Sequence, residues 1–449
     1  MTQFDSHPTR KHKSPHRHRD KSLGTPELIA IALGGMVGGG IFTVLGISVG
    51  MIGVFTPLAF LIGGALAMLA SYSYVKLGVY FKDEGASYAF FKKTFPGSHF
   101  AASLIGWYVI FGFISTLAIY AYTFSAYFLS SFDWDAPTWA RQLVAMAMLS
   151  GFALINVWSV KGMGKLEDFL VYGKLLILSI IAFVLINYGD AHLPDLMPDT
   201  DQPLAFGFQI LIVAALTFVA YEGFQLVANA VNEIDDVERR LPLGMYSAIA
   251  IAAGIYFLIA LGAVLAIPFE QIIENKEHAL AAGTSEALGK WGLYLMILGA
   301  LMATSSAVSG TLFGASRQMA VIAEDGYFPP ALSKRSSQHI PVNAVITMAV
   351  AASLLILVGN LKMLVEFGSI TFLWVSLLMA VANYRIRHLT KANPTITISA
   401  IVGLGLASVL ILYYEIRHAP AEVTVIIGLY VLLTLSAWGY SRWHCRKKQ

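Results

Sequence analysis

The sequence Gly34-Gly35-Met36-Val37-Gly38-Gly39-Gly40 places five glycines among seven residues, inside the first apolar stretch that is long enough to cross a membrane. Each glycine within a helix costs about 0.5–1 kcal/mol relative to alanine, so this run predicts an interruption of the helix. At membrane depth, free backbone groups are tolerated only where they line a cavity or are buried in protein. The run therefore predicts a small polar site, built from backbone groups, in the middle of a membrane.

The composition of the whole chain is that of a membrane protein. Of its 449 residues, 57% are hydrophobic and 13% are charged, whereas roughly a quarter of the residues are charged in soluble domains. We expect an all-α membrane protein with about twelve transmembrane helices of roughly 20 residues each. The expected spans lie near residues 25–50, 55–80, 99–130, 139–158, 166–188, 205–231, 242–267, 290–317, 341–358, 362–386, 394–414 and 421–441. The third and the eighth exceed the length that a bilayer requires, which predicts long helices that tilt or continue into a loop.

The basic residues predict the orientation of these spans. Of the 30 lysines and arginines, 24 lie on the side shared by the two chain ends and 5 lie on the opposite side, while Lys174 falls inside a span. Cytoplasmic loops of membrane proteins carry the excess of Lys and Arg. Both ends are therefore expected in the cytoplasm, and the short loops agree with a multi-pass protein of the plasma membrane.

The two ends of the chain are predicted to be tails rather than domains. Residues 1–24 are polar and basic and lack the apolar core of a signal peptide, so they are expected to be disordered and attracted to anionic lipid headgroups. Residues 442–449 form a short second tail with the single cysteine, Cys445. One cysteine excludes an intrachain disulfide and any cysteine-based metal cluster. We expect no metal, cofactor or nucleic acid as a partner, and the sequence leaves the oligomeric state open.

A second interruption lies about 180 residues beyond the first. The sixth predicted span reads Thr217-Phe218-Val219-Ala220-Tyr221-Glu222-Gly223-Phe224, so a charge and a glycine interrupt an apolar helix. Interrupted spans at matching positions of two halves are typical of transporters built from inverted repeats. The sequence thus predicts two repeats of five helices, residues 25–188 and 205–386, followed by two extra helices within 394–441. Close packing of small residues is the alternative explanation for one glycine run, and the second break weakens it.

These interruptions carry a resemblance to a known family. The run from Gly34 to Phe42 resembles the first-helix signature of the amino acid-polyamine-organocation transporters, and four further segments follow the family pattern in order. These segments are Asp83-Glu84-Gly85-Ala86-Ser87-Tyr88, Ala220 to Gly223 with Asn232-Glu233, Gly310 to Arg317, and Glu324 to Pro329. The resemblance covers roughly residues 22–440. It implies an amino acid permease in which the first and sixth helices are discontinuous.

Two residues depart from the family pattern. Gly39 stands where many members have serine, so a hydroxyl is absent although the amide remains. Glu222 stands where many members have a small or apolar residue. Three roles are open for Glu222: it carries a proton, contacts a cationic substrate, or caps the broken helix by accepting amide hydrogen bonds.

The two breaks predict a site for a small zwitterion. A helix that restarts at Gly39 presents free amides at the positive end of its dipole, which suits a carboxylate. Free carbonyl groups at the end of the first half-helix and at the sixth-helix break suit an ammonium. An α-amino acid carries both groups, and the resemblance implies the same assignment. The predicted substrate-binding residues are Met36, Gly38, Gly39, Gly40, Ile41, Phe218, Val219, Ala220 and Glu222; weaker candidates for contacts to the substrate side chain are Tyr221, Phe224, Ile114 and Tyr120.

Lys174 is the second candidate functional residue. A lysine inside a span costs several kcal/mol unless a partner or a cavity receives it, and burial favours release of its proton. The resemblance implies that this lysine takes the place of a sodium ion and bridges the first and eighth helices. Its expected neighbours are Gly34, Thr304, Ser305 and Ser306. The alternative is a lysine that extends toward the cytoplasm near Glu167 or Asp168, although roughly 12 Å of helix makes that difficult.

Together these features predict a secondary transporter that takes up an amino acid with a proton as the coupling ion. An amino acid or amine exchanger uses the same fold, and a nontransporting amino acid receptor is a further alternative. A divalent-metal transporter is disfavoured because the first break offers only glycine, without the ligands that such metals prefer. An enzyme is not expected, since the spans carry no His/Asp/Ser constellation.

Overall fold

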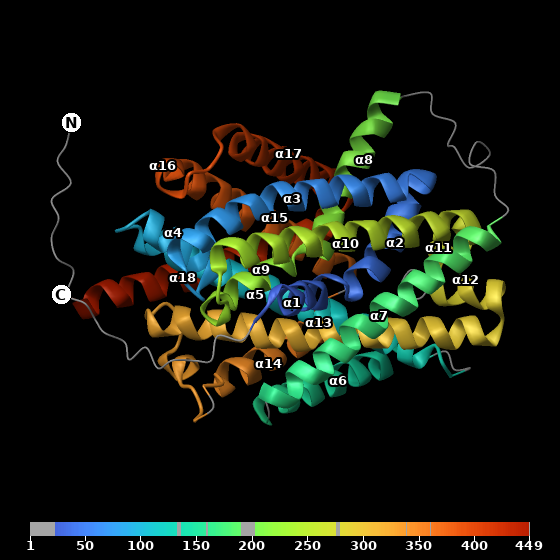
Figure 1. Ribbon diagram of the computed structural model, residues 1–449, viewed down its shortest axis with the longest axis horizontal. Coiled ribbons are helices and arrows are strands. Elements are labelled where there is room, and N and C mark those ends of the chain that lie inside the picture. The colour runs from blue at the N-terminus through green and yellow to red at the C-terminus, as the bar shows by residue number, and fades with distance from the viewer. Residues whose placement is uncertain are drawn as a thin grey trace.

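The computed structural model describes residues 23–132, 136–158, 160–189, 203–274, 279–337, 339–359 and 361–448. Within these residues every regular element is a helix, apart from a single β-bridge between Leu23 and Ile234. The long helices α3, α10 and α13 run along the longest axis of the molecule, with shorter helices at both ends (Figure 1). The prediction of an all-α membrane protein is confirmed.

All twelve predicted spans correspond to helices. In chain order these are α1 (Thr25–Met36) with α2 (Gly39–Ile52), α3 (Thr56–Phe81), α5 (His99–Leu129), α6 (Thr138–Trp158), α7 (Val160–Tyr188), α8 (Pro203–Thr217) with α9 (Phe224–Asn229), α10 (Val237–Ala266), α13 (Lys290–Glu324), α14 (Val342–Val358), α15 (Leu361–Arg385), α17 (Pro394–His418) and α18 (Pro420–Lys448). Ten stretches of the described residues are long and apolar enough to cross a membrane. Ten stretches are found instead of twelve because α2 and α3 form one stretch of 43 residues, and because α14, with 17 residues, is shorter than the 18 residues required.

Four short helices lie between the spans: α4 (Ala86–Thr94), α11 (Phe269–Glu274), α12 (Ala279–Leu288) and α16 (Arg387–Thr390). The two spans that were predicted to be longest are α5, with 31 residues, and α13, with 35. These two pack against each other, and α13 also packs against α1; α3 and α10 contact both broken helices. The division of the chain into two inverted repeats stays a prediction.

The first break falls between α1 and α2. Val37 has a ψ of 74°, and Gly38 has a φ of −125° and a ψ of −144°, so neither residue continues the helix. The surrounding helices leave no room for side chains here: a Cβ on Gly38 would lie 2.5 Å from the Cβ of Ala307 in α13. The glycines therefore weaken the helix and also admit close neighbours.

The second break separates α8 from α9, and it touches the first. A 3₁₀ turn, η3 (Phe218–Tyr221), follows α8, and two residues, Glu222 and Gly223, separate it from the start of α9. A Cβ on Gly223 would lie 2.2 Å from the amide nitrogen of Met36 and 2.4 Å from the carbonyl carbon of Gly35. The two interrupted helices therefore cross with their backbones in direct contact. The prediction of two discontinuous helices is confirmed.

The end of the bundle that carries α4 is tied together by polar contacts. Tyr88 donates a hydrogen bond to Asp325 at 2.8 Å, and Lys92 forms an ion pair with the same carboxylate at 2.6 Å. Burial and then the negative charge of Asp325 raise the pKa of Tyr88, so its hydroxyl stays protonated and donates. Arg335 pairs with Glu84 at 3.1 Å. These contacts join the connection between α3 and α5 to the connection that follows α13.

Candidate functional site

The Lys174 side chain is buried in α7 and contacts the last turn of α1. Its Nζ lies 3.0, 3.1 and 2.6 Å from the carbonyl oxygens of Leu33, Gly34 and Val37, and 2.6 Å from Oγ of Ser306 in α13. Because an ammonium has three hydrogens, two of these four acceptors share one hydrogen. The carbonyls lie at the end of α1 that carries the partial negative charge of the helix dipole. Charge-assisted hydrogen bonds of this kind are stronger than neutral ones. The ammonium thus connects three helices at a place that would suit a small cation.

This geometry contradicts the alternative in which Lys174 extends toward Glu167 or Asp168. All four hydrogen bonds of the ammonium go to α1 and α13, and the Lys174 side chain is fully buried. Glu167 lies two turns earlier on α7, so its carboxyl acts on Lys174 only at a distance. The alternative is wrong because backbone oxygens within reach already solvate the charge.

Two of the four expected neighbours of Lys174 are its hydrogen-bond partners, Gly34 and Ser306. The hydroxyl of Thr304 instead donates to the carbonyl of Ala300 in its own helix at 2.8 Å. Ser305 is buried on α13. Ser306 also donates to its own helix, so its oxygen accepts from Lys174 with a lone pair that remains free.

The start of α2 presents the amides that were predicted to hold a carboxylate. The first amides of an α-helix have no partner within the helix, and here these are the amides of Gly39, Gly40 and Ile41. No side chain caps the start of α2 in their place. A Cβ on Gly39 would lie 2.9 Å from Oγ1 of Thr123 in α5, and that hydroxyl shares a hydrogen bond of 3.1 Å with Thr43. Thr123 therefore brings a hydroxyl to the place where Gly39 has no side chain. Nothing local in the sequence indicated this contact between two helices.

The carbonyl groups of the breaks were expected to be free, and that expectation is wrong for this conformation. The hydroxyl of Tyr256 in α10 lies 2.6 Å from the carbonyl oxygen of Met36 and 2.9 Å from that of Ala220. The Met36 carbonyl also accepts from the amide of Gly38 at 2.9 Å. Because a hydroxyl donates a single hydrogen, Tyr256 satisfies one of these two carbonyls at a time. The carbonyl oxygens of Met36 and Ala220, one from each break, therefore lie close to the same hydroxyl group.

Glu222 lies buried between the two breaks. Its Oε1 is 3.3 Å from the hydroxyl of Tyr120, and that hydroxyl lies 3.0 Å from the carbonyl oxygen of Gly35, so its single hydrogen serves one of the two acceptors at a time. The hydroxyl of Thr116 lies close to the carboxyl but donates to the carbonyl of Phe113 at 3.0 Å, so Oε2 accepts no hydrogen bond among the described residues. The capping role is wrong, because the N-cap of α9 is Gly223 and no side chain caps that helix. Glu222 is therefore a buried carboxyl with one oxygen left for another partner.

A family model described as amino acid permease matches residues 23–435. The chain belongs to the amino acid permease family. The permease is 28% identical to the inner membrane transport protein YbaT of Escherichia coli, over 93% of this chain and 96% of that protein. It is 28% identical to an uncharacterized protein of Methanocaldococcus jannaschii, over 88% and 90% of the two chains. It is 24% identical to the branched-chain amino acid permease BcaP of Bacillus subtilis, over 96% and 95%.

This membership confirms the resemblance seen in the sequence. The permease is an integral, multi-pass membrane protein that belongs among amino acid transporters and not among enzymes. The family and the named relatives support an amino acid as the substrate.

The residues of the permease that were predicted to contact the substrate side chain face different helices. The Tyr221 hydroxyl donates to the carbonyl of Phe60 in α3 at 2.7 Å, and Phe224 packs edge-on against Tyr74 of α3 with ring centres 5.4 Å apart. Both therefore turn toward α3 rather than toward the break in α1–α2. Tyr120 contacts both breaks, as described above. Phe218 and Ile114 are buried.

A small, largely enclosed cavity lies between α1, α7, α9 and α13 of the permease. Its charged lining consists of Glu167, Glu233 and Arg317, beside Asn229 and Gly310. Oε1 of Glu167 is buried without a hydrogen-bond partner among the described residues. The cavity adjoins the helices that hold Lys174, and Glu233 is partly exposed at its outer side. Polar side chains thus continue from the site toward the end of the bundle that carries α4.

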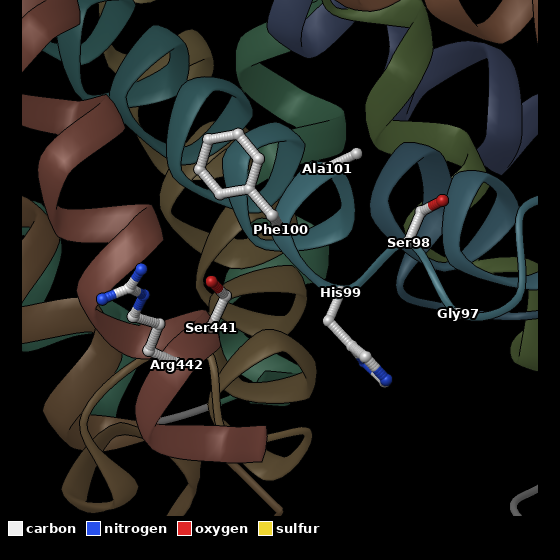
Figure 2. A pocket seen from close by; sticks show the side chains of 7 residues that line it. All are labelled: Gly97, Ser98, His99, Phe100, Ala101, Ser441 and Arg442. Atoms are coloured by element: carbon white, nitrogen blue, oxygen red, sulfur yellow. The ribbon is translucent and has the colours of Figure 1, made fainter. Parts of the chain in front are cut away.

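A more open hollow of the permease lies elsewhere. Figure 2 shows its lining, which comes from the loop and first turn at the start of α5 and from the last part of α18. The residues are Gly97, Ser98, His99, Phe100, Ala101, Ser441 and Arg442. Neither broken helix contributes to it. The candidate site is therefore the contact between the two breaks.

Proposed function

We propose that this permease takes up an amino acid together with a proton by alternating access. The observation that carries the proposal is the set of four hydrogen bonds from Lys174 to α1 and α13. When charged, the ammonium holds α1 against α7 and α13 through the dipole end of α1. When neutral, it has one hydrogen fewer to donate and loses that attraction, which frees α1 to move. A proton on Lys174 would thereby switch the permease between a held and a released state.

The substrate is proposed to bind at the two breaks. Its carboxylate would accept from the amides of Gly39, Gly40 and Ile41, beside the hydroxyl of Thr123. Its ammonium would take the position of the Tyr256 hydroxyl, between one carbonyl oxygen from each break. An ammonium has three hydrogens and satisfies both carbonyls together, which the tyrosine cannot do. The support for this assignment is the convergence of those carbonyls and the uncapped start of α2.

The proposal extends to the arrangement of the permease in its membrane. Residues 25–188 and 205–386 would form the two inverted repeats that rock around the site. The excess of basic residues supports a cytoplasmic location for both ends, in the plasma membrane. The polar cavity lined by Glu167, Glu233 and Arg317 would then form part of a route for the proton toward the cytoplasm.

Uptake into proteoliposomes tests this function. With a panel of labelled amino acids and amines, an inward proton gradient alone is expected to drive accumulation of at least one amino acid, and replacement of sodium is expected to change nothing. Flux that requires substrate preloaded inside would instead show an exchanger. Binding without flux under any gradient would show a receptor. Either of these results would overturn the proposed symport.

Glu222 supports a cationic amino acid or an amine as a second candidate substrate class. Its buried Oε2 accepts no hydrogen bond among the described residues. One relative is named cationic amino acid transporter 4 of Mus musculus, and it is 24% identical over 83% of this chain and 61% of that protein. Hydrogen bonds to charged groups contribute about 1.5–3 kcal/mol. Glu222→Gln is therefore expected to weaken competition by lysine and arginine about tenfold or more, while competition by neutral amino acids stays within about twofold.

The competition assay for Glu222 uses labelled substrate and unlabelled competitors at several pH values. Glu270→Gln, at an exposed position in α11, is the matched control and is expected to behave as the wild type. An altered pH profile for every competitor would assign Glu222 to proton transfer instead. Unchanged competition by all substrates would exclude a contact with the substrate.

A further inference from the structure

Two glutamates meet between α15 and α17, away from the site described above. Glu366 lies in the second turn of α15 and is 1% exposed, and Glu415 lies in the last turn of α17 and is 0% exposed. Each carboxyl is a direct neighbour of the other. Apart from the ammonium of Lys362, which faces Oε1 of Glu366, the four oxygens have no hydrogen-bond partner among the described residues when both groups are carboxylates. Two carboxylates can only accept, so neither can donate to the other.

The charges around this pair do not balance if both carboxyls are ionised. The ammonium of Lys362 lies 3.3 Å from Oε1 of Glu366, and its side chain is 41% exposed. The other titratable groups that face the pair are Tyr414 and His418 on α17 and Glu422 at the start of α18. Two buried negative charges would therefore share one ammonium. A buried charge without a partner is costly, and two adjacent carboxylates that share a site cannot both ionise readily.

We propose that Glu366 and Glu415 share one exchangeable proton and form a proton-binding site between α15 and α17, separate from Lys174. One protonated carboxyl donates to the other carboxylate, and Lys362 balances the single remaining charge. The ammonium already next to Oε1 disfavours a metal cation in the same place. The partly exposed Lys362 marks the side from which water and the proton reach the pair.

The same part of α15 contacts the sixth-helix break, so this proton is placed to affect the substrate site. The hydroxyl of Ser369 donates to the carbonyl of Leu216 in α8 at 2.9 Å. A Cβ on Gly368 would lie 3.1 Å from Cγ2 of Val219 in η3. Loss of the shared proton would set two carboxylates against each other and weaken the attachment of α15 to α17. The inference does not depend on symport and holds equally for an exchanger.

Thermal unfolding of the purified full-length protein as a function of pH tests the shared proton. The folded pair holds a proton that two solvated glutamates would have lost at neutral pH, so stability falls as pH rises. Between about pH 6 and about pH 9 we expect the wild-type Tm to fall by about 2–4 °C more than that of Glu415→Gln, whose amide supplies a permanent donor. Glu238→Gln, whose side chain is 75% exposed, is the control and should follow the wild type. Identical pH profiles for the wild type and Glu415→Gln would overturn the proposal.

Infrared difference spectroscopy gives a readout that does not depend on the stability of a variant. In the wild type, raising the pH is expected to remove a protonated-carboxyl band, and this loss is expected to be absent in the E366Q/E415Q double variant. Persistence of the full band change in the double variant would place the proton elsewhere. If sodium, compared with choline at equal ionic strength, raised the wild-type Tm and left Glu415→Gln unchanged, the pair would be a cation site and the proposal would be wrong.

Discussion

Replacing Lys174 with alanine is expected to reduce the accumulation driven by a proton gradient by at least about tenfold. The substitution removes all four hydrogen bonds that the ammonium makes to α1 and to Ser306, together with the group proposed to carry the proton. Without a titrating group, the state of α1 no longer depends on pH. Uptake measured in proteoliposomes at several external pH values is expected to become small and independent of pH.

The Lys174 experiment has a matched control in Lys290→Ala, because Lys290 is exposed at the start of α13. That variant is expected to keep the wild-type dependence on the gradient. Exchange of labelled for unlabelled substrate shows whether Lys174→Ala still folds and binds, since exchange needs no net proton movement. Gradient-driven uptake at the wild-type level in Lys174→Ala would disprove the role of this lysine. That result would not contradict the proposed proton-binding site of Glu366 and Glu415.

Replacing Gly223 with alanine is expected to destabilise the permease and to abolish transport. The added Cβ would lie 2.2 Å from the amide nitrogen of Met36 and 2.4 Å from the carbonyl carbon of Gly35. Both atoms belong to backbone and cannot rotate away, so the two breaks must move apart. Overpacking of this kind costs about 1–3 kcal/mol, and the displacement also separates the carbonyl oxygens of Met36 and Ala220 that converge on one donor position.

Gly254→Ala is the control for this contact. A Cβ on Gly254 would have no atom within 4 Å, and the residue is exposed in the middle of α10. Alanine there is expected to leave transport unchanged and to favour the helix by about 0.5–1 kcal/mol. Thermal unfolding and uptake of both variants decide the prediction. A Tm and an uptake rate of Gly223→Ala equal to those of the wild type would show that the two helices do not cross in this way.

The spans and their breaks were predictable because each depends on neighbours in the sequence. An apolar stretch of about 20 residues has one stable conformation in lipid, since a helix satisfies its own backbone. The glycines around Gly38 and the charge at Glu222 oppose that conformation locally, and the structure breaks α1–α2 and α8–α9 at those places. The amides at the start of α2 follow directly from the first break.

The partners of those backbone groups were not predictable. Carbonyl oxygens of the breaks were expected to be free, yet Tyr256 and Tyr120 reach them from α10 and α5. For a tyrosine inside an apolar helix, the sequence does not indicate which face of the helix the residue occupies or which other helix it contacts. The same holds for Thr123 beside Gly39, and for the pair formed by Glu366 and Glu415.

By itself the sequence determined that this chain is an all-α membrane protein with two interrupted helices, and that Lys174 must find a partner inside the membrane. Hydropathy and helix propensity are properties of short segments, so they can be read without knowing the fold. Only the tertiary structure decided which oxygens receive Lys174, because its partner Leu33 is 141 residues away along the chain. The packing of whole helices sets contacts at that separation, and no local preference of the backbone specifies them.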